Sequence, residues 1–198
     1  MVADEPQASD NSIQTLSDGS TVTIRPMGED DLGPVLQFAR SLSDHDLLFL
    51  RRDITVAADI VAWLSDVEAG RNFTQMAFQD DRLVGYASVS ISHLHWKQHV
   101  AELRVLTSPL VRGKGLGRLL TNDAFRLAMD IGVEKMVAQM TPDQEAAVGV
   151  FYRLGFEQEA RLRAEVRDRD GRKHDLLVLS LDVSSHQETR RAREASAG

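Results

Sequence analysis

Three glycines within six residues, Arg112–Gly117 (RGKGLG), separate a strand-like segment at 99–107 from a segment with helical periodicity. Apolar residues after the glycines recur at helical spacing, at 116, 119, 120, 124, 127, 128 and 131. The first N–H groups of a helix lack intrahelical partners, and glycine lets the backbone approach a ligand closely. Because the helix dipole adds partial positive charge, this junction favours an anion-binding turn.

Three phosphate-binding patterns can be compared with this turn. The Walker pattern requires a glycine, then four residues, then a Gly-Lys pair followed by Ser or Thr. This stretch has neither the spacing nor the Ser or Thr. The dinucleotide pattern G-x-G-x-x-G fails because residue 118 is arginine. The pattern R/Q-x-x-G-x-G/A fits at Arg112, Gly115 and Gly117. The simplest alternative is a flexible loop with solvated cations.

The rest of the chain alternates strand and helix patterns, which predicts a mixed α/β or α+β domain. Besides the segments on either side of the glycines, the expected strands are 21–26, 72–79, 82–91 and 135–140. Further helices are expected at 29–42, at 55–70, and from a capping box at Thr141–Gln144 to about Leu154, before Gly155. Hairpins are expected to turn at Asp80-Asp81 and at Asp170-Gly171, before a last strand at 174–183. This organisation predicts a flexible arm over 1–19, a domain over 20–183 and a solvated tail over 184–198.

Composition limits the functional classes. The chain of 198 residues has no cysteine and a net charge of −7. These values exclude disulfides, thiolate catalysis and cysteine-ligated zinc, and argue against broad nucleic-acid binding. The polar N-terminus does not resemble a signal peptide, and no run approaches the roughly 18 apolar residues of a membrane helix. We therefore expect a cytoplasmic protein that binds neither membrane nor nucleic acid.

The chain resembles the GCN5-related N-acetyltransferase (GNAT) family in three segments. These are the glycine-rich turn, the preceding LRVLT with Pro109, and the later AAVGVFYRLGF (146–156). The resemblance covers 21–183, roughly four fifths of the chain. The run from DGSTVTIRP through ELRVLTSP to VRDRDGRKHDLLVLS is also similar to the acetyltransferase domain of bacterial protein-lysine acetyltransferases. The resemblance implies a single GNAT-type domain, with a mixed central sheet of about six to seven strands and helices on both faces, that uses acetyl-CoA.

The resemblance also implies which residues bind the donor. Backbone amides of 113–118 would hold the pyrophosphate, and the strand backbone at 105–107 would pair with pantetheine where two central strands splay apart. Lys114 and Arg118 would either add charge or be solvated, and Arg112 would either contact the ligand or position the loop. The expected donor-binding set is Val105, Leu106, Thr107, Arg112, Gly113, Lys114, Gly115, Leu116, Gly117, Arg118, Gln144 and Phe151.

Acetyl transfer needs a base for the amine and a proton for the departing thiolate. Glu102, on the strand before the loop, is the leading base; the alternative is a structural glutamate paired with Arg104. The family's usual acid, a tyrosine, is replaced by Phe151, and Tyr152 lies one residue, or about 100° of helix rotation, away. Either Tyr152 reaches the sulfur by an altered helix path, or water or backbone assists the thiolate. His93, His95 and His99 are alternative bases, but they cluster around an apparent turn, so most are expected to be solvated. No metal is expected.

The predicted function is acetyl transfer from acetyl-CoA to a primary amine by direct attack in a ternary complex. The acceptor is a protein lysine or a small amine, and the acidic net charge weakly favours a cationic one. The alternatives are a catalytically weak acyl-CoA-binding or sensing domain and a different phosphate binder. Trp63 is expected in the core and Arg51-Arg52 in solvent. The oligomeric state is not fixed, and a homodimer is left open.

Overall fold

The computed structural model describes residues 11–48 and 50–183. The expectations for residues 1–10 and for the tail at 184–198 lie outside the described residues. The chain forms a mixed eight-stranded sheet in the order β1-β2-β3-β4-β5-β6-β8-β7. It divides into two compact units, each formed by two segments. The first contains the chain up to Ser90 and Arg104–Ile131, and the second contains Ile91–Leu103 and the chain from Gly132 on. Each unit is described by itself.

The strands of the first unit form an antiparallel meander. They are β1 (Ser12–Thr15), β2 (Thr21–Pro26), β3 (Asn72–Gln79) and β4 (Arg82–Ile91), and the second half of β5 (Val100–Thr107) belongs to the same unit. The turn expected at Asp80-Asp81 is confirmed, because Gln79 pairs with Arg82 and both aspartates have positive φ, 48° and 61°. Aspartate is one of the few residues that adopts this conformation at moderate cost.

The flexible arm expected over 1–19 is wrong for Ser12–Thr15, which form β1. Ser12 pairs with Ile24 and Thr15 with Thr21, and the chain then turns at Gly19, whose φ is +84°. This strand alternates half-buried and exposed positions, so it needs few apolar residues and looks polar in sequence. It brings the sheet to eight strands, above the six to seven expected.

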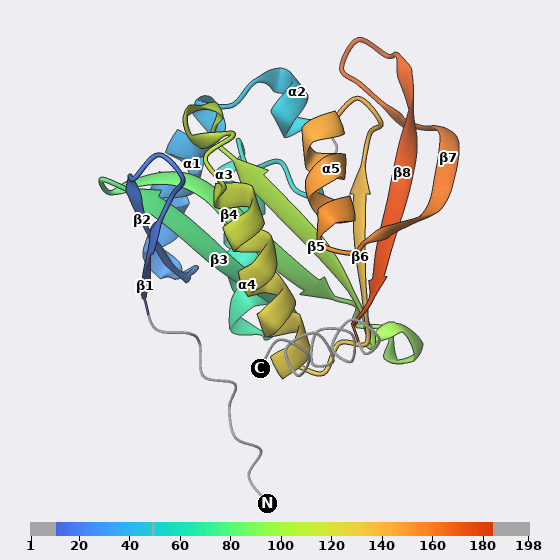
Figure 1. Ribbon diagram of the computed structural model, residues 1–198, viewed down its shortest axis with the longest axis horizontal. Coiled ribbons are helices and arrows are strands. Elements are labelled where there is room, and N and C mark those ends of the chain that lie inside the picture. The colour runs from blue at the N-terminus through green and yellow to red at the C-terminus, as the bar shows by residue number, and fades with distance from the viewer. Residues whose placement is uncertain (1–10, 49, 184–198) are drawn as a thin grey trace, which may run out of the picture. The chain divides into compact units, whose positions relative to one another are not determined.

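Helices cover both faces of this meander, as expected (Figure 1). On one face lie α1 (Leu32–Arg40), after the short turn η1 (Glu29–Asp31), and α3 (Ala57–Glu68); on the other lies α4 (Leu116–Asp130). The short helix α2 (Asp44–Leu47) connects α1 to the segment before α3. The core between α1, α3 and the sheet contains the buried side chains of Val35, Phe38, Ile60, Trp63, Met76 and Tyr86. The core position expected for Trp63 is therefore confirmed.

The second unit contains β6 (Lys135–Met140), α5 (Glu145–Arg153), β7 (Glu157–Arg167) and β8 (Lys173–Asp182), with the first half of β5 and the short turn η2 (His95–Lys97). β5 pairs with β6 in parallel, whereas β6–β8 and β7–β8 are antiparallel. The hairpin turn at Asp170-Gly171 is confirmed: the Gly171 N–H donates to the Asp168 carbonyl at 3.0 Å, with φ +82° at Gly171.

The capping box expected at Thr141–Gln144 forms only in part. The Gln144 Oε1 accepts from the Thr141 N–H at 3.2 Å, but the Gln144 N–H donates to the Thr141 carbonyl at 3.1 Å. The Thr141 hydroxyl is therefore not the acceptor, and it is buried without a hydrogen-bond partner. This turn delays the helix, so α5 begins at Glu145 rather than at Pro142. Among the described residues, no helix is long and apolar enough to cross a membrane.

Candidate active site

The glycine-rich loop follows β5 through a short 3-10 turn, η3 (Pro109–Val111). The Ser108 N–H donates to the Val84 carbonyl of β4 at 2.8 Å, and the Ser108 hydroxyl accepts from the Leu110 N–H at 3.3 Å. These bonds fix where β5 ends and where the chain turns toward α4.

The backbone of the loop requires glycine at two of its three glycine positions. Gly113 has φ +75° and Gly115 has φ +91°, the left-handed region that other residues rarely adopt. Gly117 lies in the first turn of α4 without positive φ. A Cβ built on any of the three meets no heavy atom within 4 Å, so the space over the loop is open. Such a cradle suits a group that must contact the backbone closely.

Backbone N–H groups without intrahelical acceptors lie at the start of α4. The first bond at this helix runs from the Leu119 N–H to the Gly115 carbonyl at 3.1 Å. The amides of Leu116, Gly117 and Arg118 precede it and have no intrahelical acceptor. The Lys114 amide, which was expected to face the pyrophosphate, instead donates to the Val111 carbonyl at 3.3 Å. The donors at the helix start, with the dipole of a 15-residue helix, suit a phosphate group.

Two of the loop cations are held by protein partners rather than solvated. The Arg112 guanidinium donates to the Asp46 carboxylate of α2 at 2.5 Å and to the Thr107 carbonyl at 3.3 Å, so Arg112 ties the loop to β5. The Lys114 ammonium lies 2.9 Å from the Asp18 carboxylate in the β1–β2 turn. Hydrogen bonds from Ser20 and Lys114 hold the pKa of Asp18 well below its usual range. Arg118 is exposed.

Gly85 on β4 lies close to β5 and to the start of α4, and its role was not recognised in the sequence. A Cβ at this position would lie 2.9 Å from the Leu106 carbonyl and 3.2 Å and 3.3 Å from the side chains of Leu116 and Leu120. Only glycine lets β5 and the start of α4 approach β4 this closely. A lone glycine inside a strand pattern is the sequence sign of such an approach.

We expect Gly85→Ala to lower the melting temperature by roughly 2–10 °C, because overpacking costs about 1–3 kcal/mol and the chain is of moderate size. Differential scanning calorimetry measures the shift. Gly33→Ala is the matched control, since a Cβ there meets nothing within 4 Å and lies in helix α1. An unchanged melting temperature for Gly85→Ala would show that β4 and α4 do not depend on this close packing.

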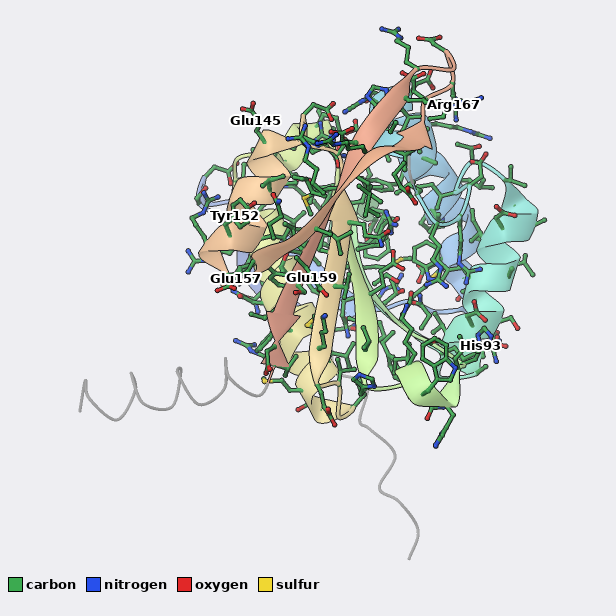
Figure 2. The ribbon with its side chains drawn as sticks, turned by 90° about the vertical axis from the view of Figure 1, so that its right-hand side faces the viewer. His93, Glu145, Tyr152, Glu157, Glu159 and Arg167 are labelled. Atoms are coloured by element: carbon green, nitrogen blue, oxygen red, sulfur yellow. The ribbon has the colours of Figure 1, made fainter. Side chains whose placement is uncertain are left out.

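The remaining candidate residues belong to the second unit, and Figure 2 labels one of them, Tyr152. Glu102 is half-buried on β5 opposite Val137 of β6. Phe151 is only 5% exposed and packs edge-on against Phe156, with ring centroids 5.0 Å apart. Tyr152, the next residue of α5, is 44% exposed. The rotation of one helical residue therefore places the phenylalanine in the core and the tyrosine at the surface.

We expect Tyr152→Phe to change the turnover number by less than about twofold, whereas loss of a general acid typically costs about a hundredfold or more. The reason is that α5 is regular up to Arg153, so the altered helix path that would redirect Tyr152 is not seen. Steady-state kinetics with saturating acetyl-CoA measures this. A fall of a hundredfold with unchanged coenzyme A affinity would instead establish Tyr152 as the acid.

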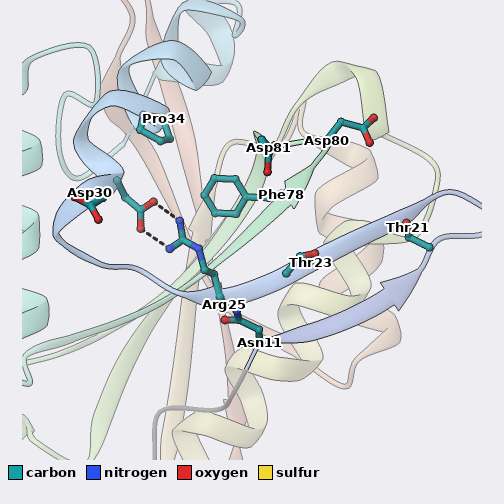
Figure 3. Close-up of a pocket in the computed structure, with 10 residues that line it drawn as sticks. Asn11, Thr21, Thr23, Arg25, Asp30, Pro34, Phe78, Asp80 and Asp81 are labelled. Carbon is teal, nitrogen blue, oxygen red and sulfur yellow. Dashed lines mark hydrogen bonds and ion pairs between the residues drawn. The ribbon is translucent and has the colours of Figure 1, made fainter.

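A hollow of about 500 Å³ lies elsewhere in the first unit, between β2, η1 and the β3–β4 turn (Figure 3). The Arg25 guanidinium in this hollow donates two hydrogen bonds to the carboxylate of the buried Asp31, at 2.8 Å and 2.6 Å. It also lies 4.4 Å from the centre of the Phe78 ring. The Asp31 carboxylate also accepts from the Gly28 N–H at 2.8 Å. None of the lining residues belongs to the glycine-rich loop or to β5. We interpret this arrangement as a structural ion pair.

The three histidines lie in or beside the η2 turn and are exposed, as expected. Within 11–48 and 50–183, no group of three or more His, Asp or Glu side chains is arranged to hold a metal ion.

The chain combines a mixed eight-stranded sheet with a glycine-rich helix start that suits a phosphate group. Residues 38–156 match the model of the Acetyltransferase (GNAT) family, and the chain belongs to that family. It is an N-acyltransferase of that family.

Similar proteins give further detail. The L-amino acid N-acyltransferase MnaT of Escherichia coli (strain K12) is 29% identical over 142 residues, 69% of this chain and 80% of that protein. YwnH of Bacillus subtilis (strain 168), named for phosphinothricin acetyltransferase activity, is 29% identical over 84 residues. That match covers 42% of this chain and only 51% of YwnH. The comparisons therefore do not single out protein-lysine acetyltransferases.

A solved structure of yncA from Salmonella typhimurium, containing acetyl-CoA, shares the fold. Its TM-score is 0.71 at 24% identity, and the match covers 82% of this chain and 94% of that one. At this identity the likeness supports the fold alone.

Proposed function

We propose that the enzyme acetylates the amino group of a small amine or amino acid, and that acetyl-CoA binds with its pyrophosphate on the Arg112–Gly117 loop. The observation that carries the donor site is the open space over three glycines, next to helix amides without intrahelical acceptors. The names of MnaT and YwnH support a small acceptor.

The backbone of β5 provides the next part of the donor site. Its ladder with β6 covers Val100–Glu102 and Lys135–Val137, three of the eight residues of β5. Beyond the last residue that pairs with β6, the strand continues through Val105, Leu106 and Thr107. We propose that these three residues pair with the pantetheine amides, as the family resemblance implies. Gln144 and Phe151 complete the proposed donor-binding set.

The proposed reaction is direct. The amine nitrogen attacks the thioester carbonyl carbon, a C–N bond forms, the C–S bond breaks, and the thiolate leaves with a proton from water. The amine must lose a proton, and Glu102 is the proposed acceptor of that proton, directly or through water. The thioester is already activated, so positioning of the two substrates supplies much of the rate.

One assay tests the proposal against its alternatives. The full-length enzyme is incubated with acetyl-CoA and a panel of amines containing amino acids, polyamines and lysine peptides, and free thiol is followed. We expect release that depends on a small amine. Release with lysine peptides alone would favour a protein-lysine acceptor, and tight coenzyme A binding without release from any amine would favour a sensing domain. Failure to bind coenzyme A would reject the donor site.

A further inference from the structure

The turn between β1 and β2, at residues 16–20, lies against the glycine-rich loop. Its Ser17 N–H donates to the Lys114 carbonyl at 3.0 Å, and its Asp18 carboxylate lies 2.9 Å from the Lys114 ammonium. Both contacts are within the first unit. The turn precedes residues 38–156, which match the family model. A part of the chain outside the matched region therefore contacts one residue of the loop twice.

Hydrogen bonds inside this turn hold Ser17 in place. The Gly19 N–H donates to the Leu16 carbonyl at 3.0 Å, which closes a β-turn with Ser17 at its second position. The Asp18 carboxylate accepts from the hydroxyl and from the N–H of Ser20, at 2.6 Å and 3.1 Å. Leu16 is only 3% exposed and anchors the turn in the core. The position of the Ser17 N–H is therefore fixed from both sides.

The backbone of Lys114 is held at both of its polar groups. Its N–H donates to the Val111 carbonyl at 3.3 Å, and its carbonyl accepts from Ser17. Lys114 lies between Gly113 and Gly115, which both have positive φ. Because glycine adopts many backbone conformations, the flanking residues alone do not fix the direction of the Lys114 carbonyl. The bond from the β1–β2 turn fixes it.

The direction of the Lys114 carbonyl also sets the direction of the Gly115 N–H. The two groups belong to one peptide unit, which is planar and trans, so they point in opposite directions. With the carbonyl directed at the β1–β2 turn, the Gly115 N–H is directed away from that turn. A Cβ built on Gly115 meets no heavy atom within 4 Å, so the space beside this residue is open. The Gly115 N–H is thus oriented independently of the ligand.

We infer that the β1–β2 turn is a positioning element of the donor site, in which the main chain of Ser17 aims the Gly115 N–H at the donor pyrophosphate. This inference rests on the proposed function and adds a segment outside the glycine-rich loop to the same site. Ser17 acts through the Lys114–Gly115 peptide unit and does not itself touch the donor. Asp18 and the Lys114 ammonium are both partly exposed, so we assign the positioning to the main-chain bond.

Ser17→Pro removes the N–H that Lys114 accepts from and preserves the turn. Proline is favoured at the second position of a β-turn, and the backbone at Ser17 does not have positive φ. Ser17→Ala, at the same exposed position, keeps the N–H and is the matched control. We expect Ser17→Pro to bind coenzyme A about fivefold more weakly than Ser17→Ala, which corresponds to about 1 kcal/mol, or one net hydrogen bond. Isothermal titration measures both affinities.

Titration with two parts of coenzyme A separates positioning from a general structural effect. ADP contains the pyrophosphate, and pantetheine contains none. We expect Ser17→Pro to lower the affinity for ADP about fivefold, again by one net hydrogen bond, and to leave the affinity for pantetheine unchanged. Equal loss of both affinities would overturn the inference, because a disturbed fold weakens both parts alike. Equal coenzyme A affinities of Ser17→Pro and Ser17→Ala would overturn it as well.

Hydrogen exchange in the wild-type enzyme gives a readout that needs no substitution. A bound pyrophosphate fixes the Gly115 N–H, and with it the Lys114 carbonyl that accepts from Ser17. We therefore expect the Ser17 amide to exchange at least about threefold more slowly when coenzyme A is bound. A Ser17 exchange rate that does not respond to bound coenzyme A would overturn the inference, even if Ser17→Pro fails to fold. Failure of the wild-type enzyme to bind coenzyme A would instead reject the donor site itself, and the inference with it.

Discussion

Gly115→Asp is expected to weaken coenzyme A binding by at least about a hundredfold. The backbone at Gly115 has φ +91°, and an L-residue there costs roughly 1–2 kcal/mol. The added carboxylate would compete for the amides at the start of α4 and repel the pyrophosphate. The combined cost of about 3 kcal/mol corresponds to more than a hundredfold in dissociation constant. Isothermal titration with coenzyme A measures it.

Gly117→Ala is the matched control for the loop. A Cβ at this position meets nothing within 4 Å, the residue lies within α4, and the fitted pattern allows alanine there. We expect coenzyme A affinity within about threefold of wild type and stability equal or higher, because alanine is favoured over glycine in helices by about 0.5–1 kcal/mol. Gly115→Ala separates the two effects, since it introduces backbone strain without charge. Wild-type affinity in Gly115→Asp would reject the loop as the pyrophosphate site.

The loop and much of the sheet could be predicted because their determinants are local. The bounds of 72–79, 82–91 and 135–140 match β3, β4 and β6, since each strand is an apolar run between turn residues. The strand β1 was missed because an edge strand with one exposed face carries little apolar signal. The start of α5 was misplaced because the Gln144 N–H has two competing acceptors on Thr141, and sequence does not tell which one wins.

A small recess in the first unit could not be predicted, because residues from separate segments line it. Its walls include Arg51, Trp63, Asn72, Tyr86 and Arg104, which come from a loop, a helix, one strand start and two strand interiors. Arg51 and Arg52 were expected in solvent, but both line this recess, and Arg52 is ion-paired with Asp66 of α3.

Glu102→Gln is expected to lower the turnover number about a hundredfold, the lower range for loss of a general base, with unchanged coenzyme A affinity. Glutamine keeps the size of the side chain and its place opposite Val137, so the β5–β6 ladder should persist. The deficit should shrink at high pH, because an acceptor amine that deprotonates in solution no longer needs the base. Rates across pH 6–10, a range spanning the ordinary pKa values of about 8 to 10 for amines, measure this.

Glu157→Gln is the control for this prediction, because Glu157 is an exposed glutamate at the start of β7. It should leave turnover unchanged at every pH. A Glu102→Gln enzyme with wild-type turnover across the range would make Glu102 a structural residue of the strand. A deficit that stays constant with pH would point to a role in placing the acceptor, because only proton removal makes the loss depend on the protonation of the amine.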